Sequence, residues 1–138
     1  MRANRSMPEC TVIPELPYSD VESAVDWLCA AYGFTPRVRM GTHRAQLNVG
    51  AGAVVVMEVG ENDVTCAVMV RIEDLDRHYA DAVRAGAAIV KAPADYPYGE
   101  RQYTARDPGH LWTFSQTIAD VAPEDWGGIA VVPEDPEP

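Results

Sequence analysis

Few side chains of this sequence could bind a metal ion or catalyse a reaction. The histidines are His43, His78 and His110, and the cysteines are Cys10, Cys29 and Cys66. No two of them have the spacing of a metal-binding knuckle, and the chain contains no G-x-S-x-G and no phosphate-binding loop. Three scattered cysteines are typical of reduced thiols in a cytoplasmic protein and not of a disulfide framework. We therefore expect no catalytic residue and a cytoplasmic location.

Aromatic side chains with a polar group are the more informative residues. Three Trp and six Tyr stand against only two Phe. Such rings suit the binding of planar ligands by stacking. Tyr98, Tyr103 and Trp112 lie close together in the second half of the sequence, and we expect them to form walls of a binding site. Packing in the core or in a hairpin stays open as the alternative for each of them.

Two amphipathic helices are expected to carry the framework that positions these residues. The first begins near Ser19, which has capping-box spacing to Glu22, and ends at Gly33. The second spans about residues 74–85 and is followed by Gly86. Both have apolar residues at the 3.6-residue period of a helix with one buried side.

The two helices belong to a repeat. Asp20 and Asp74, which stand at their starts, are 54 positions apart. Strand-like segments precede each helix and three more follow it, separated by Gly, Asn and Pro. These segments are 11–16, about 37–40, 44–49 and 53–59 in the first half, and 65–70, about 88–91, 101–106 and 110–116 in the second. The sequence thus predicts an α+β fold in which two β-α-β-β-β modules form a curled mixed sheet around a cavity.

Charge and composition limit the possible partners. The 138-residue chain has a formal net charge of −10, and six of its acidic residues lie in 117–138, where there is no Lys or Arg. An acidic protein is not expected to bind nucleic acid or an anionic membrane surface. No run of 18 apolar residues predicts a membrane span.

The domain organisation follows from these patterns. We expect an N-terminal extension at 1–9, one domain at 10–128 with modules 10–60 and 64–116, and a tail at 129–138. The tail alternates acidic residues with proline, so we expect it to be disordered.

The most specific motif is the segment 98–114, YGERQYTARDPGHLWTF. It resembles the final hairpin of the vicinal oxygen chelate superfamily, which includes glyoxalase I, extradiol dioxygenases and bleomycin-resistance proteins. That hairpin has an aromatic-Gly-x-Arg run followed by Arg-Asp-Pro-x-Gly-x, and the turn here is one residue shorter. The segments 14–20, PELPYSD, and 125–128, DWGG, resemble the small bleomycin-resistance-like branch. The resemblance covers about residues 10–128.

Enzymes of this superfamily hold a divalent metal with His and Glu from four strands around the cavity. The resemblance carries these positions to Ile13, Ala67, Thr113 and Glu58. A transition metal needs three or four imidazole or carboxylate donors, and only Glu58 is one. We therefore expect no metal and no cofactor, with a metal-dependent lyase or dioxygenase of the glyoxalase type as the alternative.

Alternation of side chains along the strands predicts which residues line the cavity. If Thr113 faces the cavity, as the resemblance implies, Trp112 faces away. By the same rule, Met69 and Arg71 should face the cavity together with Ala67, and Val56 should face it together with Glu58. The predicted ligand-binding residues are Ile13, Val56, Glu58, Ala67, Met69, Arg71, Tyr98, Tyr103, Trp112 and Thr113.

The resemblance and the missing metal donors favour a binding protein over an enzyme. They imply a protein that binds or sequesters an aromatic or peptidic natural product such as an antibiotic, in resistance or as an accessory of antibiotic biosynthesis. The resemblance also implies a homodimer and leaves open whether modules are swapped between subunits.

Overall fold

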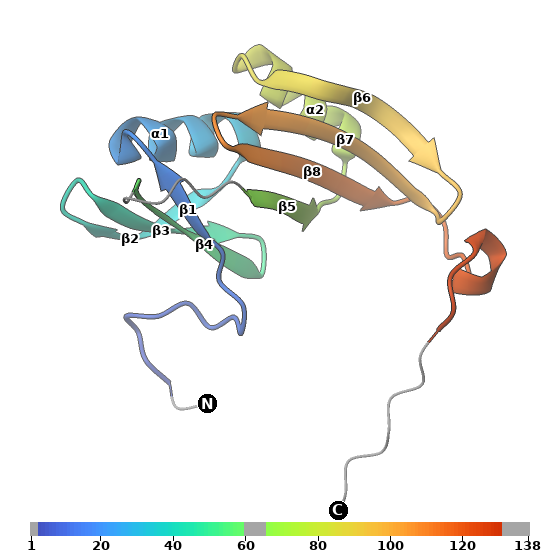
Figure 1. Ribbon diagram of the computed structural model, residues 1–138, viewed down its shortest axis with the longest axis horizontal. Helices are drawn as coiled ribbons and strands as arrows, with labels where there is room; N and C mark the ends of the chain where they lie inside the picture. The colour runs from blue at the N-terminus through green and yellow to red at the C-terminus, as the bar shows by residue number, and fades with distance from the viewer. Residues whose placement is uncertain (1–2, 60–65, 131–138) are drawn as a thin grey trace, which may run out of the picture.

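A computed structural model describes residues 3–59 and 66–130 of the chain (Figure 1). The elements in chain order are β1 (Glu15–Tyr18), α1 (Val21–Tyr32), β2 (Thr35–Met40), β3 (Arg44–Val49), β4 (Gly52–Glu58), β5 (Cys66–Arg71), α2 (Leu75–Arg84), β6 (Ala88–Tyr96), β7 (Glu100–Asp107), β8 (His110–Thr117) and the short 3-10 helix η1 (Pro123–Trp126). The predicted junction between the modules and most of the predicted tail lie outside the described residues.

Each half of the chain forms its own four-stranded mixed sheet. The strand order is β1-β4-β3-β2 in the first sheet and β5-β8-β7-β6 in the second. In both, the first strand of the module pairs in parallel with the last, with Glu15 opposite Val55 and Cys66 opposite His110. The repeated order confirms the predicted β-α-β-β-β modules and the α+β fold. The two sheets do not pair with each other within the described residues, so the curl is open.

Both helices begin at an aspartate. The carboxylate of Asp20 accepts a hydrogen bond from the Ser23 backbone N–H at 3.1 Å and is the N-cap of α1. Asp74 caps α2 in the same way. The capping box expected from Ser19 is wrong by one residue, because Asp20 supplies the capping oxygen. No helix among the described residues is long and apolar enough to cross a membrane.

Two strands differ from their predicted bounds by more than two residues. The strand expected at 11–16 begins only at Glu15, because Pro14 has no N–H with which to pair. The carbonyl of Pro14 still accepts from the Val55 N–H at 2.9 Å. β6 is longer than the expected 88–91 and continues to Tyr96, with irregular register against β7 between Ile89 and Ala94.

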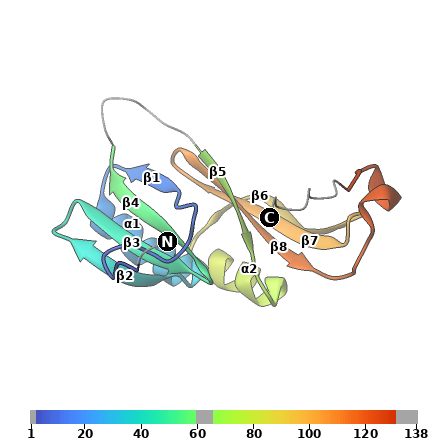
Figure 2. The same cartoon turned by 90° about the horizontal axis from the view of Figure 1, so that it is seen from below.

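One core joins the two modules. The helices pack on each other, and each covers one side of the sheet of its own module, as Figures 1 and 2 show. Tyr32 at the end of α1 is the central residue, with ring centroids 5.7 Å from Trp112 and 4.8 Å from Phe114 of the second sheet. His78 of α2 lies 4.2 Å from the Phe114 ring. The opposite side of each sheet therefore faces away from the helices.

Candidate ligand-binding site

The side of the second sheet that faces away from α2 is the candidate site, and we call it the open face. Side chains alternate strictly along β5: Ala67 and Met69 are exposed, whereas Cys66 and Val68 pack against the core. The register extends this face across β8 and β7. Its central residues are Ala67, Met69, Arg71, Gln102, Thr104, Leu111 and Thr113, and Ser115, which is only 1% exposed, is buried among them.

Hydrogen bonds between side chains organise the polar part of the open face. The Gln102 amide donates to the Ser115 hydroxyl at 2.9 Å, and that hydroxyl donates to Glu100 at 2.9 Å. The hydroxyls of Thr104 and Thr113 share a hydrogen bond of 2.9 Å across the strand pair. These bonds hold the side chains of neighbouring strands in fixed positions, so the surface offered to a ligand is largely preformed.

Exposed apolar groups and one cation complete the open face. Met69 is 62% exposed and Leu111 is 42% exposed, and both lie on the same face of two paired strands. Arg71 donates to the Thr117 hydroxyl at 3.1 Å, and no carboxylate among the described residues forms an ion pair with it. The face thus combines a polarizable thioether, hydroxyls and a guanidinium that is free to bind an acceptor.

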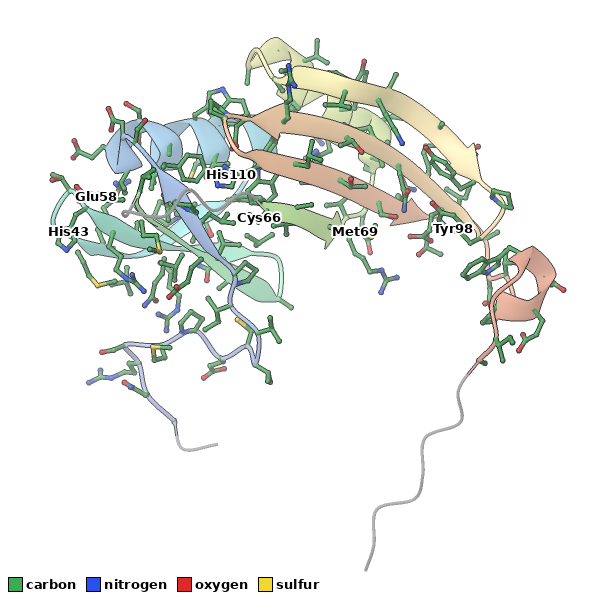
Figure 3. All side chains as sticks on the ribbon, in the orientation of Figure 1. His43, Glu58, Cys66, Met69, Tyr98 and His110 are labelled. Atoms are coloured by element: carbon green, nitrogen blue, oxygen red, sulfur yellow. The ribbon has the colours of Figure 1, made fainter. Side chains whose placement is uncertain are left out.

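Tyr98 lies at the far end of this face, as Figure 3 shows. Its ring stacks on Tyr96 with a centroid distance of 5.4 Å and an interplanar angle of 11°, and Trp126 of η1 meets it edge-on at 5.6 Å. The Tyr98 hydroxyl donates to Gln102 at 3.0 Å. Gly99 makes the turn beside this ring possible, because a Cβ there would lie 2.4 Å from the Ala119 carbonyl oxygen. An aromatic cluster therefore ends the open face.

Tyr103 and Trp112, which the sequence suggests as ligand walls, are fully buried in the core. The Tyr103 hydroxyl bonds to His78 Nδ1 at 2.5 Å, and the Trp112 indole N–H donates to Asp107 at 3.3 Å. Neither ring can contact a ligand on the open face, so that expectation is wrong for both and the packing alternative holds. Alternation along the last strand predicted that Trp112 faces away from the cavity, and its burial in the core confirms this.

Val56 also lies in the core, under α1. It is paired with Leu16 of β1 and Ala45 of β3, which are buried on the same side of the first sheet. The expectation that Val56 faces the cavity is wrong, because the side of β4 that includes Val56 packs on the helix. Val55 occupies the other side, opposite Gln46 of β3.

Ile13 and Glu58 belong to the first module and lie apart from the open face. Ile13 borders a hollow on the first sheet together with Val55 and Gln46. Glu58 is exposed at the end of β4, and Figure 3 shows it at the opposite end of the molecule from Tyr98. Within one chain, the structure brings together Ala67, Met69, Arg71 and Thr113, with Tyr98 at the margin of the same sheet.

The positions that would hold a metal by resemblance are separated in the same way. Ala67 and Thr113 lie on the open face, and neither Ile13 nor Glu58 reaches it. Among the described residues, no three His, Cys, Asp or Glu side chains come together in an arrangement that could hold a metal ion. That the protein uses no metal stays a prediction.

A second hollow lies where the two modules meet, outside the set predicted from sequence. Its walls include Pro17 and Trp27 from the first module and Pro108 from the second, and it has a volume of about 710 Å³. The Tyr18–Asp107 hydrogen bond links the modules there. In the sequence the only sign of this groove is Trp27, which stands off the apolar stripe of its helix.

Comparisons with known proteins relate the chain to one family. TioX from Micromonospora sp. ML1 is 37% identical, with a TM-score of 0.73 over 78% of this chain and 98% of that one. TnmS3 from Streptomyces sp. CB03234, described as an antibiotic binding protein, is 24% identical, with a TM-score of 0.66 over 80% of this chain and 98% of that one. The uncharacterized protein Rv0887c of Mycobacterium tuberculosis (strain ATCC 25618 / H37Rv) is 26% identical over 82% of this chain and 78% of its own length.

The family model for the Glyoxalase/Bleomycin resistance protein/Dioxygenase superfamily matches residues 10–114, which is most of the chain. This match includes both helices and all but the last residues of β8, and the solved structures share the same fold. The chain belongs to the Glyoxalase/Bleomycin resistance protein/Dioxygenase superfamily.

Proposed function

We propose that this protein binds an aromatic or peptidic natural product, such as an antibiotic, without a metal ion, and that the open face of the second sheet is one wall of the binding site. The observation that carries the proposal is the combination of exposed Met69 and Leu111 with an ordered layer of hydroxyl and amide groups. A flat ligand with a few polar groups needs both kinds of contact.

The residues at the positions that correspond to metal ligands in enzymes of the superfamily support binding of an organic ligand and not metal chemistry. Ala67 and Thr113 are small, so they leave room above the sheet, and neither supplies a ligand that transition metals prefer. Arg71 on the same face can donate to a carbonyl or carboxylate of the ligand. The description of TnmS3 as an antibiotic binding protein indicates that a protein of this fold can bind such a compound.

We further propose a homodimer in which a second copy covers the open face. In one chain the two sheets lie side by side and not face to face, so their sides away from the helices do not close on each other (Figures 1 and 2). A cavity with walls on both sides therefore needs another copy, whose first sheet would lie over the second sheet of its partner. The exposed apolar groups on β5 and β8 are consistent with such a cover. In this arrangement Ile13 and Glu58 of one copy would approach the open face of the other.

A thermal-shift screen tests the proposed function. The purified protein is heated with a panel of aromatic and peptidic antibiotics, bleomycin among them. A ligand that binds only the folded state raises the melting temperature as its concentration rises. We expect at least one compound of the panel to do so in proportion to concentration. A panel without any stabilising compound would contradict the proposal.

A further inference from the structure

The side of the first sheet that faces away from α1 is not open, because the N-terminal segment of the chain lies on it. Residues 3–13 run across the side of this sheet that faces away from α1, as Figures 1 and 2 show. Pro8 is buried there although it belongs to no helix or strand. The corresponding side of the second sheet carries no such cover within the described residues.

Arg37 and Gln46 hold this segment by its backbone. The Arg37 guanidinium donates to the carbonyl oxygens of Arg5 and Met7 at 3.0 and 2.9 Å. The Gln46 amide donates to the carbonyl oxygen of Ser6 at 2.9 Å. Three consecutive carbonyls are thus bound by two side chains, and none of these bonds involves a side chain of the segment. These hydrogen bonds recognise peptide carbonyls in a particular geometry and not the side chains of the segment.

A turn gives the carbonyls this geometry. The Met7 N–H donates to the Asn4 carbonyl at 3.1 Å, and the Ser6 N–H donates to the Asn4 side-chain oxygen at 3.0 Å. Such turns point successive carbonyls outward. The three acceptors therefore reach the sheet together.

Arg37 and Gln46 also hold each other in position. Arg37 donates to the Gln46 side-chain oxygen at 2.5 Å, which leaves the Gln46 NH₂ directed at the segment. Gln46 is only 5% exposed under the segment, and no ion pair joins Arg37 to a carboxylate among the described residues. The Arg37 guanidinium and the Gln46 NH₂ can therefore donate hydrogen bonds to any carbonyl groups that contact this part of the sheet.

We propose that Arg37 and Gln46 form a binding site for a turn of peptide carbonyls, and that residues 4–8 occupy it as a built-in stand-in that a peptidic ligand displaces. This inference rests on the proposed function, of which it names the ligand class, a peptide with a compact turn. The family model matches residues 10–114, so the turn lies outside the part of the chain that the family shares. The occupant is therefore an addition to the fold, whereas Arg37 and Gln46 lie within it.

Tethering makes the stand-in an effective competitor. A segment joined to its site by a few residues has an effective concentration in the millimolar range. A free peptide of the same sequence must compete with it, and we expect release of the segment to strengthen binding of the free peptide about tenfold.

The test uses full-length variants and a synthetic peptide with the sequence of residues 3–9 as the probe. Pro8→Asp places a charge where the segment is buried and so should release it, while the sheet keeps both binding residues. Binding of the peptide to ¹⁵N-labelled protein is followed by NMR titration. Hydrogen exchange of the Met7 amide reports whether the segment is released. If Pro8→Asp fails to fold, Pro8→Gly is the second release variant.

We expect Pro8→Asp to expose the Met7 amide and to bind the peptide about tenfold more tightly than the wild-type chain. Adding Arg37→Met should abolish that binding, whereas adding Arg39→Met should not. Arg39 is a matched control, because it lies in the same strand and approaches Asp26 at 4.0 Å instead of the segment. In the otherwise wild-type chain, Arg37→Met alone should also expose the Met7 amide.

Three results would overturn the inference. A released segment without peptide binding would show that the pair is no peptide site. Binding that survives Arg37→Met would place the peptide elsewhere. A Met7 amide that stays protected in both the Pro8 variants and Arg37→Met would show that these contacts do not hold the segment. The antibiotic screen has a separate outcome. Peptide binding without any stabilising antibiotic would contradict the proposed function and leave Arg37 and Gln46 as a peptide site with no assigned natural ligand. A stabilising antibiotic without peptide binding would remove only this inference.

Discussion

The hydroxyl of Tyr18 in β1 donates a hydrogen bond of 2.6 Å to the carboxylate of Asp107 at the end of β7, 89 residues further along the chain. The same carboxylate accepts from His110 Nδ1 at 2.5 Å and from the Trp112 indole at 3.3 Å. The first module thus donates one of three hydrogen bonds to a buried acid of the second. This contact fixes the relative position of the two sheets and of the faces they present.

Tyr18→Phe should lower the free energy of unfolding by about 1–3 kcal/mol, because it removes a donor from a buried carboxylate. Urea denaturation measures the loss. Tyr79→Phe is the matched control, since the Tyr79 hydroxyl has no hydrogen-bond partner among the described residues and its ring packs edge-on against Tyr103. An equal effect of the two substitutions would contradict a specific role for the Tyr18–Asp107 contact.

His78 should make the protein less stable in mild acid. Its Nε2 lies 3.0 Å from the Tyr32 carbonyl oxygen, so Nε2 carries the proton, and Nδ1 accepts from the Tyr103 hydroxyl. The neutral ring satisfies both contacts, and burial lowers the pKa of His78. The unfolded chain, with a histidine pKa of about 6.5, binds a proton before the folded one does. Stability therefore falls as the pH drops below about 6.5.

Melting temperatures between pH 8 and pH 5 test this prediction. The decrease should be smaller in His78→Gln than in the wild type, although the variant starts from a lower stability. His43→Gln, which changes an exposed histidine in the β2–β3 hairpin, should keep the wild-type slope. If the slope of His78→Gln matched the wild type, the titration of His78 would not be its cause.

Stability should also fall at high pH. Burial raises the pKa of the phenols of Tyr18, Tyr32 and Tyr103, and it raises the pKa of the Cys29 and Cys66 thiols as well. A raised pKa means that the unfolded chain loses its protons first, so the stabilisation is complete below the unfolded values and is lost above them. These values are about 8.5 for Cys and 10 for Tyr. We expect the melting temperature to decline between pH 9 and pH 11.5, and a constant value over this range would disprove the prediction.

Tyr98 and the buried aromatic residues should respond differently to truncation. Tyr103→Ala and Trp112→Ala remove fully buried rings and should each lower the free energy of unfolding by about 3–5 kcal/mol. Tyr98→Ala should affect stability much less, because the ring is only half-buried. If Tyr98 stacks on the ligand, its loss should weaken binding about two- to tenfold. Calorimetric unfolding and a ligand titration on each variant separate the two roles, and unchanged ligand affinity in Tyr98→Ala would exclude the stacking role.

Light scattering at micromolar concentration tests the proposed homodimer. One chain has a mass of 15.1 kDa, and we expect the measured mass to be twice that value. The open face should be covered in the dimer, so Met69→Glu should shift the mass toward that of one chain without unfolding the protein. A wild-type mass near 15.1 kDa would contradict the proposal.

The fold could be predicted from the sequence because its signals are local and repeated. The 54-residue spacing and the helix periodicity correspond to the two repeated modules and their helices in the structure. Gly33, expected to end the first helix, has the left-handed φ of 77° that favours glycine. It was harder to predict which side chains of β4 face the core, because the run of valines makes both sides of this strand apolar. The neighbouring β3 held the missing signal, since polar Gln46 alternates with buried Ala45 and Leu47, which pair with Val56 and Val54.

The site could be predicted only in part, because it depends on contacts between distant segments. The alternation along β5 and β8 placed Ala67, Met69, Arg71 and Thr113 on one face. The hydrogen-bonded layer of Gln102 and Ser115 could not be found without the register of β7 and β8. Nor does any local pattern predict that the N-terminal segment lies on the first sheet, because the hydrogen bonds that hold it there are made by backbone carbonyls.

The central claim is that the open face binds an aromatic or peptidic natural product, and isothermal titration calorimetry tests it most directly. The wild-type protein and the full-length variant Thr113→Lys are titrated with the most stabilising compound of the antibiotic panel. Thr113→Lys places a long charged side chain in the middle of the open face while the core stays intact. We predict that the wild type binds more tightly than about 1 mM and that Thr113→Lys weakens binding at least tenfold with an unchanged melting temperature. No binding tighter than about 1 mM by any compound, or equal affinity in the variant, would contradict the account.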